Sequence, residues 1–250
     1  MKSNCFLILF YLIVFSGINN LNAQIKWSDL DYGAHIGTLI YQGDLTPARI
    51  GYTKCIRPMI GFNIAKSVSP FVSLRANVDF GSILANDAKY SSPSWKQLRN
   101  FNFSTSVTEL SLHGIYNFQG ENDENNFSRL QAYIFGGAGI SFLKIKRDFS
   151  KFNRTVFDAK SPVAIGLALD SVHKLPGIIP VIPMGAGLKY FINKSWSLTS
   201  EFTYRLLFTD YLDGFKYAAD RNKNDSYYGL ALGIVYRPSI NKYRCPILKN

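Results

Sequence analysis

The last strand-like segment of the chain, Ser226 to Arg237, constrains the fold more than any other. Its sequence, SYYGLALGIVYR, alternates with a period of two residues, which is the period of a β-strand. One face carries large apolar side chains with a tyrosine at each end, whereas glycine, alanine and valine dominate the other. From Tyr228 to Tyr236 a strand tilted by about 40° rises roughly 20 Å, close to the apolar band of a transmembrane barrel. The segment therefore predicts a lipid-facing barrel strand.

Seven earlier segments are also predicted to be strands, although the alternation in the first of them is too weak to assign its faces. They are Tyr32–Leu45, Arg57–Ser67, Val72–Phe80, Thr108–Phe118, Arg129–Lys146, Ile182–Tyr190 and Trp196–Phe208. Short connections follow the second, fourth and sixth segments, and long ones follow the first, third, fifth and seventh. An even strand number with short turns at one end and long loops at the other is typical of outer-membrane barrels. The sequence thus predicts an all-β fold, an eight-stranded antiparallel transmembrane outer-membrane β-barrel over residues 24–237.

Two long connections carry further expectations. Residues 85–100 are polar and are expected to form a loop without regular structure. The longest connection, Asp148 to Ile179, contains a short apolar piece, Val163–Leu169, which is either a helical turn or an extension of a strand.

The N-terminus has the three regions of a secretory signal peptide. Lys2 precedes an apolar run, Cys5–Phe15, and a polar stretch follows that ends in Leu21-Asn22-Ala23. The run is too short to span a bilayer, so residues 1–23 are predicted to be removed. With eight strands, both termini fall in the periplasm, and residues 238–250 form a periplasmic tail.

The net charge of the chain narrows the classes of partner that are expected. The 250-residue chain has a net charge of +11, which becomes +10 (27 minus 17) once Lys2 is removed. No basic helix is present, so nucleic acid is not expected as a partner, and attraction to an anionic membrane surface explains the charge.

The two cysteines that remain after removal of residues 1–23 are Cys55 and Cys245. They fall at opposite ends of the predicted barrel and are therefore expected to be free thiols.

Charged residues on the inward faces predict a filled lumen. An eight-stranded barrel is only wide enough to hold its own side chains, and enclosed charges must pair. The predicted lumen network consists of Arg57, Arg75, Asp79, Glu109, His113, Lys189, Glu201 and Arg205. We therefore expect a plugged barrel rather than a pore, with outer-membrane lipid around it. The predicted membrane-interface aromatics are Tyr116, Tyr190, Trp196, Tyr228 and Tyr236.

An enzymatic alternative rests on Glu109, Ser111 and His113, which share one inward face. A barrel lipid hydrolase would need such groups at the outer rim, whereas these lie toward the periplasmic half, so an interior hydrogen-bond network is favoured. The three histidines, His35, His113 and His173, lack zinc-like spacing. No catalytic residue, metal or cofactor is predicted, and no small-molecule substrate is evident.

Three stretches carry a resemblance to a known family. They are Tyr41-Gln42-Gly43-Asp44-Leu45, Arg99-Asn100-Phe101-Asn102-Phe103 leading to Glu109, and Tyr133-Ile134-Phe135-Gly136-Gly137-Ala138-Gly139. In these the chain resembles the PorG-type outer-membrane barrel proteins of Bacteroidetes. The resemblance implies a non-enzymatic component of the type IX secretion system that anchors periplasmic ring proteins of the PorK and PorN type to the outer membrane. The alternatives are an OmpX-like surface barrel whose loops bind ligands or mediate adhesion, and a barrel lipid hydrolase.

Overall fold

The computed structural model of the protein describes residues 27, 30–43, 45–46, 55–90, 92–120, 128–209, 211–219 and 225–238. The predicted signal peptide, residues 1–23, lies outside the described residues. So does the predicted tail, residues 238–250, apart from its first residue, and with it Cys245.

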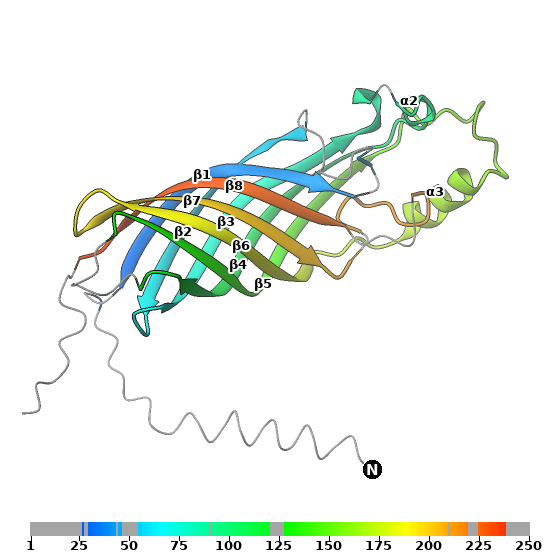
Figure 1. Cartoon of the computed structure of the whole chain (residues 1–250). Coiled ribbons are helices and arrows are strands. Elements are labelled where there is room, and N and C mark those ends of the chain that lie inside the picture. The colour runs from blue at the N-terminus through cyan, green and yellow to red at the C-terminus, as the bar shows by residue number, and fades with distance from the viewer. Residues whose placement is uncertain are drawn as a thin grey trace, which may run out of the picture.

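Eight antiparallel strands form a closed barrel (Figure 1). They are Asp31–Gln42 (β1), Arg57–Ser67 (β2), Val72–Asn86 (β3), Asn102–Asn117 (β4), Leu130–Asp148 (β5), Ile178–Phe191 (β6), Trp196–Leu207 (β7) and Ser226–Tyr236 (β8). Each strand pairs with the next, and β8 pairs back with β1 from Tyr32–Tyr236 to Gln42–Ser226. The predicted eight-stranded antiparallel barrel is confirmed, although β1 ends at Gln42 rather than at Leu45.

The predicted alternation of faces is also confirmed. On β8, Leu230, Leu232 and Ile234 are exposed, whereas Ala231 and Gly233 between them are partly covered. Every strand exposes large apolar side chains on its outer side, for example Ile36, Ile60, Leu74, Leu112, Ile134, Leu188, Leu198 and Leu232. A continuous exposed apolar belt of this extent is unfavourable in water and matches the hydrocarbon of a bilayer. We call this outer surface the lipid face.

The two ends of the barrel differ in their connections. Residues 68–71, 118–129 and 192–195 connect strands at one end, here called the turn end, which also carries the first residues of β1 and the last of β8. The connections of residues 43–56, 87–101, 149–177 and 208–225 lie at the other end, here called the loop end. This is the predicted order of turns and loops.

Three strands rise beyond the others at the loop end (Figure 1). β3 and β4 remain paired as far as Asn86–Asn102, and β4 and β5 as far as Asn102–Asp148. The expectation of an irregular loop over residues 85–100 is therefore wrong in part. β3 continues to Asn86, a 3₁₀ turn (η3, Asp87–Lys89) and a short helix (α2, Trp95–Arg99) follow, and β4 begins six residues before Thr108.

A second helix, α3, spans Pro162–Val172 within the long connection. The apolar piece Val163–Leu169 is thus helical, which decides between the two structures expected for it. Ser161 caps the helix by accepting a hydrogen bond from the N–H of Ala164, and Pro162 occupies its first turn, where a missing N–H costs nothing. Among the described residues, no helix is long and apolar enough to cross a membrane.

Cys55 is buried near the loop end as a free thiol, with its sulfur 3.5 Å from the hydroxyl oxygen of Tyr90. The prediction of a free thiol is confirmed for Cys55.

Candidate functional site: the barrel lumen

The first of two ion-pair groups in the lumen is centred on Arg75 of β3. Its guanidinium donates to both carboxylate oxygens of Glu201 on β7, at 2.5 and 3.1 Å. The Tyr133 hydroxyl on β5 donates to the same carboxylate at 2.5 Å. Because β3 and β7 lie on different sides of the barrel, this bidentate pair bridges the lumen.

The second group is centred on Arg205 of β7. Arg205 donates to Glu109 of β4 at 2.8 Å and to Asp79 of β3 at 3.2 Å. The Tyr227 hydroxyl of β8 donates to Glu109 at 2.8 Å, and the His35 ring of β1 lies 2.7 Å from the other oxygen of Asp79. This group thereby ties together five strands across the barrel interior.

A glycine makes room for the second group. A Cβ atom at Gly61 of β2 would overlap both the Asp79 carboxylate and the His35 ring. The absence of a side chain at this inward position therefore allows the pair to form.

His113 lies beside the first group. Its Nδ1 is 3.2 Å from the Arg75 guanidinium and 3.0 Å from the Asn77 amide nitrogen, and because a guanidinium only donates, Nδ1 is the acceptor. In the neutral ring Nε2 then carries the hydrogen and donates to the Ser111 hydroxyl oxygen at 3.0 Å. Glu109 is bound to Arg205. The three residues of the hydrolase alternative thus form part of the interior network.

The loop end of the lumen is closed by apolar packing. Residues from the strands, including Leu39, Phe103 and Val107, pack with Leu212, Phe215 and Ala218 of segment 211–219. Phe215 stacks on Phe101 at 4.4 Å between ring centroids. We call segment 211–219 and the side chains packed beneath it the cap.

Polar contacts fix the cap to the strands. Thr105 of β4 donates to the carbonyl oxygen of Leu212 at 2.8 Å. The Tyr41 hydroxyl lies 2.9 Å from Asp213 and 2.6 Å from Asp225, both buried carboxylates. The cap is therefore part of the folded barrel rather than a loop lying on its surface.

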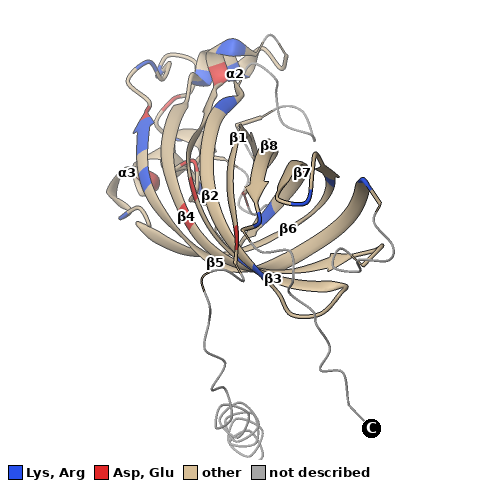
Figure 2. Ribbon diagram, turned by 90° about the vertical axis from the view of Figure 1, so that its left-hand side faces the viewer, with Lys and Arg blue, Asp and Glu red and all other residues tan. Residues whose placement is uncertain are grey.

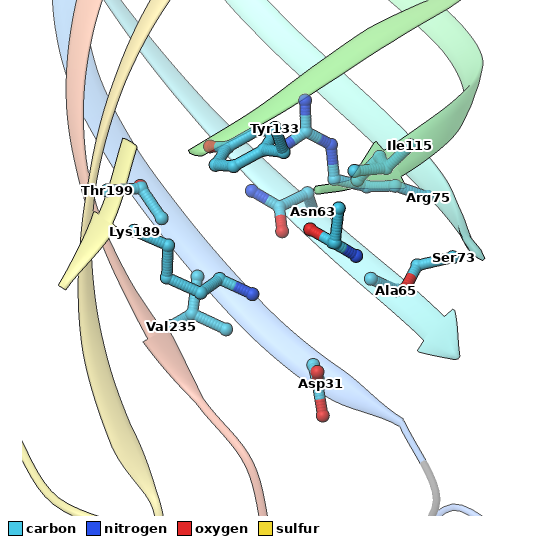
Figure 3. A pocket seen from close by; sticks show the side chains of 11 residues that line it. Asp31, Asn63, Ala65, Ser73, Arg75, Ile115, Tyr133, Lys189, Thr199 and Val235 are labelled. Carbon is cyan, nitrogen blue, oxygen red and sulfur yellow. The ribbon is translucent and has the colours of Figure 1, made fainter. Parts of the chain in front are cut away.

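The turn end of the lumen contains a small polar pocket (Figure 3). Figure 3 shows Arg75 and Tyr133 at its inner side and Lys189 and Asp31 toward the outside. Asp31 accepts hydrogen bonds from Arg237 at 2.8 to 3.2 Å, which joins the first residue of β1 to the residue after β8. This pocket forms a small polar vestibule at the turn end of the lumen.

Most predicted lumen residues meet in the structure. Seven of the eight face the interior: Arg75, Asp79, Glu109, His113, Lys189, Glu201 and Arg205. Lys189 lies in the vestibule rather than between the two ion-pair groups. The eighth, Arg57, is the first residue of β2 and is exposed, so its placement inside the network is wrong. It shares the parity of the inward residues, but β2 begins at the loop end, where the wall no longer encloses it.

Three side chains that contact the carboxylates of the two ion-pair groups were not predicted to lie in the lumen network. They are His35, Tyr133 and Tyr227. The inward parity of Tyr133 and Tyr227 was visible, and a tyrosine hydroxyl inside a narrow barrel needs an acceptor. His35 lies on β1, whose two glycines weaken the alternation that would have assigned its face.

The predicted interface aromatics lie near the two edges of the lipid face, four at the turn end and one at the loop end. Tyr116, Tyr190, Trp196 and Tyr236 are exposed toward the turn end, and Trp196 packs on Tyr236 at 4.8 Å. Tyr228 lies toward the loop end, next to Phe202 at 5.8 Å. Within the described part of the chain, no group of three or more His, Cys, Asp or Glu residues could hold a metal ion.

A family model described as "Domain of unknown function (DUF6089)" matches residues 5–237. No curated protein matches the sequence.

Among solved structures, the chain is similar to three bacterial outer-membrane proteins. Neisserial surface protein A is 13% identical, with 84% of this chain and 97% of that chain covered and a TM-score of 0.47. OprG from Pseudomonas aeruginosa is 8% identical, with coverage of 82% and 94% and a TM-score of 0.44. A major outer-membrane protein from Thermus thermophilus is 11% identical, with coverage of 83% and 98% and a TM-score of 0.44.

Proposed function

The chain belongs to the DUF6089 family, and from the barrel formed by this member we propose that it acts as a non-enzymatic anchor in the outer membrane. The observation that carries the proposal is the double closure of the lumen, by ion pairs in the middle and by the apolar cap at the loop end. A barrel closed in this way offers no path for a solute. Its working surfaces are then the lipid face and the two ends.

The proposed orientation has the turn end in the periplasm and the loop end outside the cell. Short periplasmic turns and long extracellular loops are the usual arrangement of such barrels. A cleaved signal peptide fits this orientation, because the chain must pass through the inner membrane before it inserts.

The finer proposal is that the turn end holds a periplasmic assembly of the type IX secretion system. It is supported by the resemblance to PorG-type barrels in Tyr41–Leu45, Arg99–Phe103 and Tyr133–Gly139. The turn end also exposes apolar side chains that a partner could cover, among them Val68 in the β2–β3 turn and Ile192 in the β6–β7 turn. Ring proteins of the PorK and PorN type are the expected partners.

The test is a pull-down of the tagged protein from detergent-solubilised outer membrane, with co-purifying proteins identified by mass. We expect recovery of the ring lipoprotein and its partner, and loss of both in the variant Val68→Ser/Ile192→Ser. A matched control is Val156→Ser, which removes a side chain of similar exposure from the loop end and should leave recovery unchanged. Recovery of a folded barrel alone from the wild-type strain would contradict the anchoring role.

A second candidate function is ligand binding or adhesion by the loop end, as in OmpX-like barrels. It is favoured by the exposed apolar side chains of α3, Ile165, Leu169 and Val172, which share one helical face. Binding of the protein to host or bacterial surfaces, abolished by Ile165→Ser/Leu169→Ser, would support it. A changed lipid profile in a deletion strain, restored by the intact chain, would instead favour a lipid hydrolase.

A further inference from the structure

Two lysines continue the lipid face of β5 beyond its last apolar residue. Along the outward side of the strand, Ile140 and Phe142 are followed by Lys144 and Lys146, and all four side chains are exposed. The outer surface therefore changes from apolar to cationic within one step along a single strand. We call Lys144 and Lys146 the lysine pair.

The height of the lysine pair can be compared with the layers of a bilayer. At about 3.3 Å per residue and a tilt of roughly 40°, Lys144 lies about 5 Å and Lys146 about 10 Å above Phe142. The polar headgroup layer begins where the hydrocarbon ends and extends over a comparable distance. If the hydrocarbon ends at Phe142, Lys144 lies within the headgroup layer and Lys146 just outside it, so that both long side chains can reach lipid phosphates.

The surroundings of the pair leave its charge facing outward. The residues opposite on β4 are Ser106 and Ser104, which are neutral and exposed. The next outward residue, Asp148, accepts the N–H of Ser150 at 2.9 Å. Among the described residues, neither lysine forms an ion pair. Figure 2 shows further Lys and Arg residues around α2 and α3, at the same end of the barrel.

The strand that carries the pair is held firmly. Arg147, between Lys146 and Asp148, points inward and donates to the carbonyl oxygens of Gly214 at 2.8 Å and Ser171 at 3.2 Å. The second contact joins β5 to the end of α3 on the inward side of the strand, opposite the lysine pair. The strand is thus fixed from inside while its outward face stays open to the surroundings.

We propose that the lysine pair binds the phosphate of an anionic lipid in the outer leaflet. Continuity with the lipid face and complementarity of charge identify the occupant as lipid rather than protein. The proposal rests on the proposed orientation of the barrel, because the loop end must face the outer leaflet. Anionic lipid would then bind preferentially at one side of the barrel wall, where β5 extends beyond its pairing with β6 toward the loop end.

The test measures lipid bound to the full chain without residues 1–23, folded in zwitterionic detergent. Phosphatidylglycerol and phosphatidylcholine are added in equal amounts, and bound lipids are counted by native mass spectrometry. We expect a preference for phosphatidylglycerol that falls roughly fivefold for each lysine removed in Lys144→Thr and Lys146→Thr, because a lysine near an anionic surface contributes about 1 kcal/mol. Lys144→Arg/Lys146→Arg should keep the preference.

Arg129→Thr/Lys194→Thr is the matched control, since it removes the same charge from two exposed sites at the turn end of the barrel. An unchanged preference in the Lys144→Thr/Lys146→Thr variant, or an equal loss in the control, would overturn the proposal. The outcome is separable from the anchoring role. If the unsubstituted chain shows no lipid preference but still recovers the ring proteins, lipid binding by the lysine pair is excluded and the anchoring role stands. If the chain shows the preference but recovers no ring proteins, the anchoring role is excluded and the lysine pair stands.

Discussion

Arg75 and Glu201 illustrate how single residues hold this barrel together. Their bidentate pair spans the lumen, and both groups are shielded from water. Removing a charge from water is costly, and the partner charge offsets that cost only while both groups are present. The stability of the barrel is therefore expected to fall strongly when one of the two residues is replaced, and much less when both are replaced together.

A double-mutant cycle tests this point. Arg75→Met leaves the Glu201 carboxylate enclosed with only Tyr133 as a donor, so we expect it to lower the free energy of unfolding by about 3–5 kcal/mol. Glu201→Gln should have a similar effect on Arg75. The double variant should be less destabilised than the sum of the two, as measured by urea unfolding in lipid vesicles.

The control for this cycle is Lys194→Met, which removes an exposed cation from the β6–β7 turn and should change stability by less than about 0.5 kcal/mol. Strict additivity of the two lumen substitutions would show that the residues do not act as a pair.

For single residues, the sequence predicts which charged side chains face the lumen better than it predicts which of them form pairs. The inward parity of Arg75, Glu109, Glu201 and Arg205 could be determined from alternation alone, and near balance of charge implied pairing. Which acid meets which base depends on the tilt of strands far apart in sequence, as in Arg205 and Asp79, 126 positions apart. Arg57 shows the limit, because parity does not reveal where a strand leaves the barrel wall.

Among the elements, α3 is joined to the cap through a buried carboxylate. Asp170, fully buried, accepts hydrogen bonds from the backbone N–H groups of Lys216, Tyr217 and Ala218 at 2.9 to 3.1 Å. Gly166, one turn earlier, lies against the Tyr217 carbonyl so closely that a Cβ would overlap it. The helix and the cap segment therefore hold each other in place.

Replacing Asp170 by alanine should release α3 from the cap. Three buried N–H groups would lose their acceptor, at a cost of about 3 kcal/mol or more. We expect trypsin to cleave the loop end at Lys174 or Lys216 roughly 100-fold faster, while the strands stay folded in vesicles. Asp158→Ala is the control, because its exposed carboxylate bonds only within its own turn, and it should leave the cleavage rate unchanged. Equal protection of the Asp170 variant would show that other contacts hold α3.

The strands were predictable and the loop-end structure was not, for a physical reason. Within the apolar belt, the outer face of each strand meets hydrocarbon and the inner face meets the polar lumen. The two faces therefore carry different kinds of side chain, and β7 and β8 alternate clearly in sequence. Above the belt both faces meet water or protein, so the outward residues Ser104 and Ser106 of β4 no longer contrast with a lipid pattern. The upper parts of β3 and β4, with α2 between them, therefore look like a polar loop in the sequence.

For the molecule as a whole, the main consequence is closure at two levels. The ion-pair groups fill the middle of the lumen, and the cap fills the loop end with apolar side chains. The two barriers lie in series, so a path for ions opens only when both are removed. This arrangement separates the barrel from porins, whose wider lumen holds an aqueous channel.

Single-channel recording in planar bilayers can test the two barriers separately. The wild-type barrel should show no large, stable conductance. The middle barrier is weakened in Arg75→Ser/Glu109→Ser/Glu201→Ser/Arg205→Ser, which disrupts both ion-pair groups. The cap is weakened in Leu212→Ser/Phe215→Ser, which places hydroxyls where Phe215 stacks on Phe101. Each of these variants should remain closed, because the other barrier still excludes water, whereas the variant that combines all six substitutions should conduct. Heat-dependent gel mobility would verify that every variant is folded. Stable conductance in the wild type, or in a variant with only one barrier altered, would mean that the lumen has a single barrier, and the anchor would then have to be reconsidered as a gated channel.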